Sequence, residues 1–428
     1  MPHYHIEVID GRGEDAETLE AIRAEERARM SHAVFAADHW PLFELKALRI
    51  SDRESDLFLG IDLLIMDASS IEMFKRELLW CYDHPGATPE PLAFTFRDFM
   101  RGIDAIHASE QYAKDKAFWQ GRAAAIPPAP QLPVLKDTTA AKTAVFKRLS
   151  LTLSSDQTAR LRALATANGI SLSSAICTAY ALALSAYANQ PRCTLNVTIF
   201  NKYDFHPDVA RMMGDFTSTM LLPFNFADNP TIKTVFQAIQ DEIFCGLEHR
   251  YYTGVEWLRD IKREQGTGNK AAMPIVFTST LDQADAPAVE LGDLQYAISQ
   301  TSQVYLDCQA RETPEGILVT WDYLQALFDD DLMRDMFALF EHCLQTLDRA
   351  GNVADYLQPS EACREKWKRY NETAAPVPRT TLYQLFADSV AGHGASVAVQ
   401  DAAGFYTYAQ LHEAAGCVAS AERSEERR

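Results

Sequence analysis

The sequence contains no long uninterrupted apolar run. The longest apolar helix candidate, residues 175–188, includes Cys177, Thr178, Tyr180 and Ser185, and is too short and too polar to span a bilayer. The N-terminus has no basic segment followed by an apolar one, so it does not predict a signal peptide. None of the eight cysteines forms a Cys-x-x-Cys pair. This pattern favours reduced thiols in a cytoplasmic protein over disulfides or a zinc site.

Basic residues are also scarce. The chain has 40 Lys and Arg against 59 Asp and Glu, and its formal charge of −19 argues against a nucleic-acid or anionic-membrane partner. It lacks a Gly-x-Ser-x-Gly elbow, a P-loop, a Gly-x-Gly-x-x-Gly turn and a His-Glu-x-x-His helix. Hydrolase, nucleotide-binding, dinucleotide-binding and metalloprotease interpretations therefore lose their main support. The length of 428 residues suits two or three domains.

Capping signals and hydrophobic alternation predict a mixed α/β (α+β) chain with two lobes. A helix is expected over residues 16–30, and an apolar strand over 57–66. A capping box at 69–72 then predicts a helix that continues to residue 82. Residues 96–123 suit one long helix. Four prolines within residues 126–133 favour an extended connector, which marks the first lobe boundary.

The second half continues the mixture of strands and helices. Strands are expected at 145–153, 194–200, 274–280, 294–298, 303–309 and 317–322. Helices are expected from a capping box at 154–157 to Gly169, from Ser171 or Ser173 to about 188, and at 231–248, 255–264 and 330–349. The predicted organisation is an N-terminal lobe at 1–130, a C-terminal lobe at 131–355, a linker at 356–378 and a further segment at 379–428.

The side chains that could carry chemistry are individually weak signals. Asp62 and Asp67 lie five residues apart on a strand and turn, so they should point in different directions and not share a proton. A structural role is the more common one for such carboxylates. Residues 214–222 form a glycine-led, hydroxyl-rich segment, and 274–280 end in three hydroxyls. Residues 300–309 place Asp307 at the far end of a short strand.

Taken together and in order, these segments resemble the heterocyclization domains of nonribosomal peptide synthetases. An amide-forming condensation domain would carry two histidines and an aspartate across residues 62–67. Here Asp62 takes the place of the first histidine, and Leu63 takes the place of the second, catalytic one. The further segments that carry the resemblance, between residues 4 and 350, are Trp40-Pro-Leu-Phe-Glu44, Pro127-Pro-Ala-Pro-Gln-Leu-Pro133, Phe200-Asn-Lys202, His206-Pro207, Gly214-Asp-Phe-Thr217, Phe277-Thr-Ser279, Gln300-Thr301, Gln303-Val304, Asp307 and Trp321-Asp322.

The sequence departs from the family pattern in a few places. Cys308 stands where the family usually has His or Asn, and Ser302 replaces a usual proline. The opening strand and helix of the first lobe are missing, so a fragment with an incomplete first lobe is expected. Residues 371–376 and 406–411 separately resemble the start of an adenylation domain, which stops after about fifty residues.

The resemblance implies a chloramphenicol-acetyltransferase-like fold, with a tunnel between its two lobes. Its partners would be an upstream donor and a downstream acceptor peptidyl carrier protein, beside a neighbouring adenylation domain. The chain itself would bind no cofactor or metal, because the substrates ride on the phosphopantetheine arms of the carriers. An acyl or peptidyl thioester would condense with carrier-bound Cys, Ser or Thr. Cyclodehydration would then give a thiazoline or oxazoline, in siderophores among other products.

The resemblance also implies roles for individual residues. Asp307 would be the acid–base group, and Thr278 would position either Asp307 or the hydroxyl intermediate. Asp62 and Asp67 would hold the tunnel through ion pairs. Further support of the active site is expected from Ser70, Gln303, Asp215 and Ser279. The alternatives are an inactive fragment that only docks carrier proteins, and an ordinary condensation or acetyl-transfer enzyme.

Overall fold

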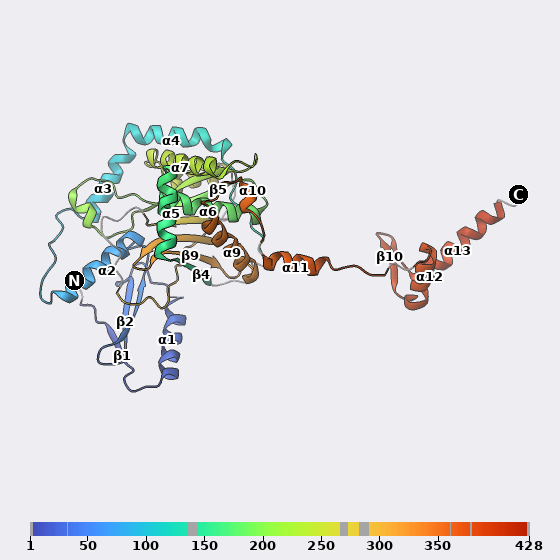
Figure 1. Ribbon diagram of the computed structural model, residues 1–428, viewed down its shortest axis with the longest axis horizontal. Helices are drawn as coiled ribbons and strands as arrows, with labels where there is room; N and C mark the ends of the chain where they lie inside the picture. The colour runs from blue at the N-terminus through green and yellow to red at the C-terminus, as the bar shows by residue number, and fades with distance from the viewer. Residues whose placement is uncertain are drawn as a thin grey trace. The chain divides into compact units, whose positions relative to one another are not determined.

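The computed structural model describes residues 3–31, 33–135, 144–265, 273–281, 291–359, 361–376 and 379–425. It divides into two compact units, Met1–Glu361 and Ala362–Arg428. Figure 1 shows the element order along the chain.

The centre of the first unit is a six-stranded mixed sheet. Its strand order is β4-β9-β8-β7-β5-β6, and β7 pairs in parallel with both β5 and β8. The other neighbours are antiparallel. The strands are β4 (Phe146–Leu153), β5 (Arg192–Phe200), β6 (Thr217–Asn225), β7 (Ile275–Ser279), β8 (Leu306–Thr313) and β9 (Gly316–Leu324).

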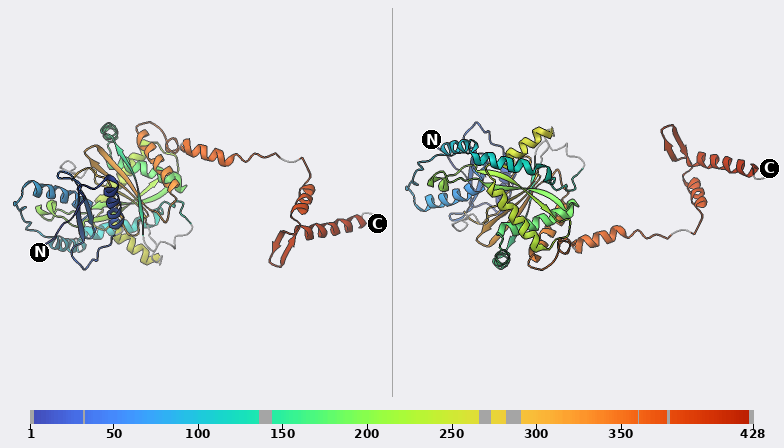
Figure 2. Two further views of the ribbon diagram at one scale, coloured as in Figure 1. Left: turned by 90° about the horizontal axis from the view of Figure 1, so that it is seen from below. Right: turned by 90° about the horizontal axis from the view of Figure 1, so that it is seen from above.

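One face of this sheet is covered by helices, because apolar side chains alternate along its strands. The core that forms there includes Cys308 and Trp321 from the sheet and nearly the whole length of α6. The covering helices are α5 (Ser155–Asn168), α6 (Leu172–Ala188), α7 (Ile232–Glu248) and α9 (Asp330–Thr346), and Figure 2 shows them from two further sides. The opposite face therefore presents the intervening side chains, which include Asp307 and Asp322.

A second, three-stranded sheet lies near the N-terminus, with β1 (Glu7–Asp10) parallel to β2 (Phe43–Arg49) and β2 antiparallel to β3 (Ser55–Ile61). Helix α1 (Ala16–Met30) lies alongside it (Figure 1). Glu26 of α1 pairs with Lys46 of β2 at 3.1 Å. The remaining helices of the unit are α2 (Ala68–Asp83), α3 (Phe96–His107), α4 (Glu110–Arg122), α8 (Gly254–Gln265) and α10 (Val353–Tyr356).

Two expectations for the first part of the chain are wrong in detail. The strand predicted to reach residue 66 ends at Ile61, and Asp67 rather than Ser69 caps the helix that follows. The helix predicted over 96–123 is two helices. The first ends at His107, and the Ser109 hydroxyl caps the second by accepting a hydrogen bond from a backbone N–H.

Two expectations for the second half are also wrong. The strand predicted at 294–298 is irregular backbone. The strand predicted from Gln303 begins only at Leu306, because Gln303 has a left-handed φ of 64° within a turn. The Ser154 capping box, the left-handed Gly169 after α5 and the Ser171 cap of α6 are as predicted.

The second unit contains α12 (Leu382–His393), the antiparallel hairpin β10 (Val397–Asp401) and β11 (Gly404–Thr407), and α13 (Tyr408–Glu425). Helix α11 (Glu361–Asn371) occupies part of the segment predicted as a linker. No described residue of this unit is buried.

Within the described ranges, no single helix is long and apolar enough to cross a bilayer. Helices α5 and α6 together, which are bent by 99° at the break between them, meet the criteria for a membrane span by length and composition alone.

Candidate functional site

Thr278 and Asp307 meet on the face of the six-stranded sheet opposite to α5, α6, α7 and α9. The Thr278 hydroxyl donates to Asp307 Oδ1 at 3.0 Å. Strand register causes this contact, because Val276 lies opposite Asp307 and Thr278 follows two residues later on the same face. Thr278 also shares a hydrogen bond of 2.9 Å with the hydroxyl of Thr198 on β5.

The other oxygen of Asp307 continues the chain of polar groups toward β9 and β4. Gln309 Nε2 donates to Asp307 Oδ2 at 2.7 Å and lies 3.4 Å from Asp322 Oδ2. Arg148 donates to both oxygens of Asp322, at 2.7 and 2.5 Å. One connected set of polar side chains therefore runs across five neighbouring strands, from Thr198 on β5 to Arg148 on β4.

The environment of Asp307 changes its acidity. Only 9% of the residue is exposed. Burial raises the pKa of Asp307 to about 6, and the nearby charge of Asp322 acts in the same direction. The hydrogen bonds from Gln309 and Thr278 and the charge of Arg148 oppose this rise in pKa. A carboxyl with a pKa near neutral can donate and then recover a proton, as general acid–base catalysis requires.

Cys308 does not belong to this set, although it follows Asp307 directly. Alternation along β8 turns its side chain to the helix-covered face, where it is fully buried. Burial raises the pKa of its thiol well above the ordinary value, so the thiol is an apolar core group there.

Asp67 and Ser70 form a second hydrogen-bonded set at the start of α2. Asp67 accepts from the backbone N–H of Ser70 at 2.7 Å and from that of Phe216 at 3.0 Å. The Ser70 hydroxyl donates to the Gly214 carbonyl at 2.9 Å. Within the described ranges neither Asp62 nor Asp67 forms an ion pair. The ion pairs expected for them are therefore replaced by hydrogen bonds to backbone N–H groups, since Asp62 accepts from Leu64 at 2.9 Å.

The other predicted support residues lie elsewhere. Asp215 is exposed and accepts from the Thr217 N–H at 3.0 Å, within its own turn. Gln303 lies on an exposed turn. Ser279 points to the helix-covered face, where its hydroxyl contacts that of Ser173 at 2.7 Å. Direct hydrogen bonds thus join two pairs of the predicted residues, Thr278 with Asp307 and Asp67 with Ser70.

Thr198, Gln309 and Arg148 were not among the site residues predicted from the sequence. Gln309 had a usable signal, because a residue two positions after Asp307 on a strand must share its face. Arg148 had none, since its contact with Asp322 depends on the pairing of β4 with β9.

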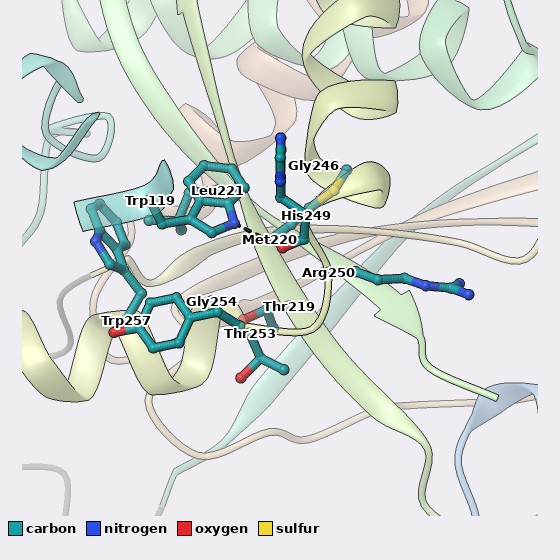
Figure 3. A pocket seen from close by; sticks show the side chains of 11 residues that line it. Trp119, Thr219, Met220, Leu221, Gly246, His249, Arg250, Thr253, Gly254 and Trp257 are labelled. Atoms are coloured by element: carbon teal, nitrogen blue, oxygen red, sulfur yellow. Dashed lines mark hydrogen bonds between the residues drawn. The ribbon is translucent and has the colours of Figure 1, made fainter. Parts of the chain in front are cut away.

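A separate hollow lies at the β6 edge of the sheet, between α7 and α8 (Figure 3). Trp119, Trp257 and His249 are among the residues that line it. His249 is tied down on two sides, because its Nδ1 lies 3.1 Å from an oxygen of Asp115 and its ring stacks on Phe118 at 3.8 Å. These contacts suit a structural histidine. In the described part of the chain, no cluster of His, Cys, Asp and Glu is arranged to hold a metal ion.

The family model "Condensation domain" matches residues 2–359. The chain belongs to the condensation domain family. It is 32% identical to bacitracin synthase 1 of Bacillus licheniformis over 421 residues, which are 97% of this chain and 8% of that protein. It is 30% identical to phenyloxazoline synthase MbtB of Mycolicibacterium paratuberculosis over 392 residues, which are 90% of this chain and 33% of that protein. The chain thus spans a third or less of these relatives.

Among solved structures, the chain is similar to the EpoB NRPS cyclization-docking bidomain from Sorangium cellulosum. The two are 29% identical with a TM-score of 0.75, over 81% of this chain and 71% of that one. The predicted family resemblance and the mixed α/β fold of a condensation-type domain are confirmed.

Proposed function

We propose that this domain performs heterocyclization in nonribosomal peptide synthesis. It would condense a carrier-bound acyl or peptidyl thioester with carrier-bound Cys, Ser or Thr, and then close and dehydrate the ring to a thiazoline or oxazoline. The observation that carries the proposal is the hydrogen bond of 3.0 Å between Thr278 and Asp307. The similarity to a phenyloxazoline synthase and to a cyclization bidomain supports it.

The first step needs little acid–base help from the protein. The amine of the acceptor residue attacks the donor thioester, forms the amide and releases the thiol of the donor arm. Both reactants are tethered to phosphopantetheine arms, so proximity supplies much of the acceleration. The presence of Asp62 and Leu63 where an amide-forming domain carries histidines is compatible with this step.

Ring closure is the step in which Asp307 acts. The side-chain thiol or hydroxyl adds to the new amide carbonyl, and its proton moves to the carbonyl oxygen. Protonated Asp307 then donates to this hydroxyl, which leaves as water. The resulting carboxylate takes the proton from the ring nitrogen, so that the C=N bond forms and Asp307 is protonated again. A positioned group of this kind typically contributes about 10²–10⁴-fold in rate.

The remaining predicted residues have supporting roles in this proposal. Thr278 orients the Asp307 carboxyl. Asp67 and Ser70 brace the 214–216 segment through the start of α2. The proposed organisation is an N-terminal lobe at 1–130, a C-terminal lobe at 131–355 and an adenylation-like segment at 379–428. The partners are an upstream donor and a downstream acceptor carrier protein.

To test the proposal, the purified protein is incubated with an acyl-loaded donor carrier protein and an acceptor carrier protein loaded with Cys, Ser or Thr. Mass spectrometry of the products should show the amide after loss of one water. Asp307→Ala should accumulate the uncyclised amide. Glu312→Ala, which removes a partly exposed carboxylate of the same strand that pairs with Arg162, should behave as wild type. Ring formation by Asp307→Ala at the wild-type rate would overturn the assignment.

Two other results would each favour an alternative. Wild-type amide that never loses water would indicate an ordinary condensation domain. Carrier binding without any product would indicate a fragment that only docks carrier proteins.

A further inference from the structure

A bridging amide controls the position of the Asp307 carboxyl. Gln309 follows Asp307 by two residues on β8, so both side chains lie on the face of the sheet opposite to the covering helices. Its Nε2 donates to Asp307 Oδ2 at 2.7 Å and also faces Asp322 Oδ2 at 3.4 Å. The orientation of this amide is therefore linked to two carboxylates at once.

A nearly buried ion pair fixes the far end of that bridge. The side chain of Asp322 is 1% exposed and that of Arg148 is 18% exposed. Their two hydrogen bonds are bidentate, which holds both groups in one geometry. The backbone N–H of Ser299 donates to Asp322 Oδ2 at 3.1 Å. This oxygen therefore faces three donors, from Arg148, Gln309 and Ser299.

The same ion pair places two opposite charges near Asp307. The negative charge of Asp322 favours a protonated Asp307, and the positive charge of Arg148 favours the ionised form. From the helix-covered side, Cys308 and Tyr180 also interact with Asp307. Burial raises the pKa of both these groups well above their ordinary values, so both are neutral near pH 7. Among the described residues, the charged groups that act most strongly on Asp307 are thus Asp322 and Arg148.

We propose that Arg148 and Asp322 are positioning residues for ring closure, which hold Asp307 through Gln309 and set the balance between its protonated and ionised forms. The proposal rests on the proposed function of Asp307. Neither residue touches the reacting atoms. Their effect reaches the substrate only through the Asp307 carboxyl.

Single charge removals should shift the titration of Asp307 in opposite directions. In Arg148→Gln the unopposed Asp322 charge should raise the titration midpoint of Asp307, and in Asp322→Asn the unopposed Arg148 charge should lower it. The shift should be about one pH unit for Asp322→Asn, because Asp322 lies opposite Asp307 on the adjacent strand β9. It should be smaller for Arg148→Gln, because Arg148 lies on β4, one strand further from Asp307. A purely structural role would not produce shifts of opposite sign.

Infrared spectroscopy measures this titration without any turnover. Each protein is compared with the same protein carrying the additional substitution Asp307→Asn. The difference between the two spectra at each pH isolates the carboxyl stretch of Asp307. Lys147→Gln is the control, since Lys147 precedes Arg148 on the strand but pairs with Asp330 instead. It should leave the midpoint of Asp307 unchanged.

A double variant keeps the test decisive if one single variant fails to fold. Arg148→Gln leaves Asp322 buried and unpaired, which is strongly destabilising. Arg148→Gln combined with Asp322→Asn removes both charges and restores a neutral hydrogen-bonded pair. Its midpoint should lie between those of the wild type and Asp322→Asn. The proposal would be overturned if the titration midpoint of Asp307 in Asp322→Asn and in the double variant equalled that in wild type.

The pH dependence of ring closure separates this proposal from the function on which it rests. With an N-acylcysteinyl pantetheine thioester as substrate, the pH–rate profile should move in the same direction as each infrared midpoint. If Asp307→Ala still closes the ring, the proposed function fails. If Asp307→Ala is inactive but the profiles of Asp322→Asn and the double variant match wild type, only the role of the ion pair fails.

Discussion

Replacing Asp307 with Asn should make the first unit more stable at alkaline pH while it removes the proposed dehydration activity. The pKa of Asp307 is about 6 in the folded protein against 3.8 for the free side chain. Between these values the folded state binds more protons than the unfolded state. Wild-type stability therefore falls as the pH rises through this window, and the loss is complete above pH 6 to 7.

The size of the effect follows from the same two values. One pKa unit corresponds to about 1.4 kcal/mol, so the rise from 3.8 to about 6 corresponds to a loss of about 3 kcal/mol in wild-type stability. Asn is neutral at every pH and escapes this loss. It can still accept from Thr278, but Gln309 must turn its amide, and the rearranged hydrogen bond costs about 1 kcal/mol. At pH 4 wild type has already lost about 0.5 kcal/mol of this stability, so we expect Asp307→Asn to be about 0.5 kcal/mol less stable than wild type at pH 4 and about 2 kcal/mol more stable at pH 8.

Urea unfolding at a series of pH values measures this difference. Tryptophan fluorescence is a suitable signal, because Trp321 is fully buried beside Cys308 in the core of the first unit. Other titrating groups are common to both proteins and cancel in the comparison. Parallel stability curves for wild type and variant across this pH range would refute the raised pKa of Asp307, and with it the account of its acidity.

Two further substitutions test the neighbouring contacts. Thr278→Val keeps the side-chain shape but removes the donor to Asp307. Ring closure should therefore slow by about tenfold or more, while amide formation is retained. Equal loss of both steps in a product time course would contradict a positioning role. Ser70→Ala removes a buried hydroxyl that donates a hydrogen bond to the Gly214 carbonyl. It should lower the free energy of unfolding, measured by urea denaturation, by about 1–3 kcal/mol. An unchanged unfolding midpoint would show that this contact does not stabilise the 214–216 segment.

Local signals in the sequence were sufficient for most of the fold. Ser154 and Ser171 are capping residues that begin helices wherever the following residues are apolar at helical spacing. Gly169 ends a helix because it adopts a left-handed φ of 64° without strain. Alternation of apolar and polar residues over 194–200 predicted the strand β5, in which Leu195, Val197 and Ile199 lie in the core.

Contacts between distant segments decided the features that the sequence could not predict. Asp67 and Ser69 are both acceptable N-cap residues, and Asp67 takes the position because its second oxygen also accepts from Phe216. The break of the helix at Ser109 has a local cause instead, because the Ser109 hydroxyl caps α4 by accepting a hydrogen bond from the backbone N–H of Tyr112.

The same limit applies to the site. The sequence resemblance selected Thr278 and Asp307, which are 29 residues apart and hydrogen-bonded. Arg148 and Asp322 are 174 residues apart, and only the pairing of β4 with β9 brings them together.

The most direct test of the central claim isolates the dehydration step. Wild type and Asp307→Asn would each be given the same preformed N-acylcysteinyl pantetheine thioester, and the appearance of the thiazoline would be followed by mass. The account predicts that wild type closes the ring and that Asp307→Asn, folded at the same pH, leaves the linear thioester unchanged. Thiazoline formed by Asp307→Asn at the wild-type rate would contradict it.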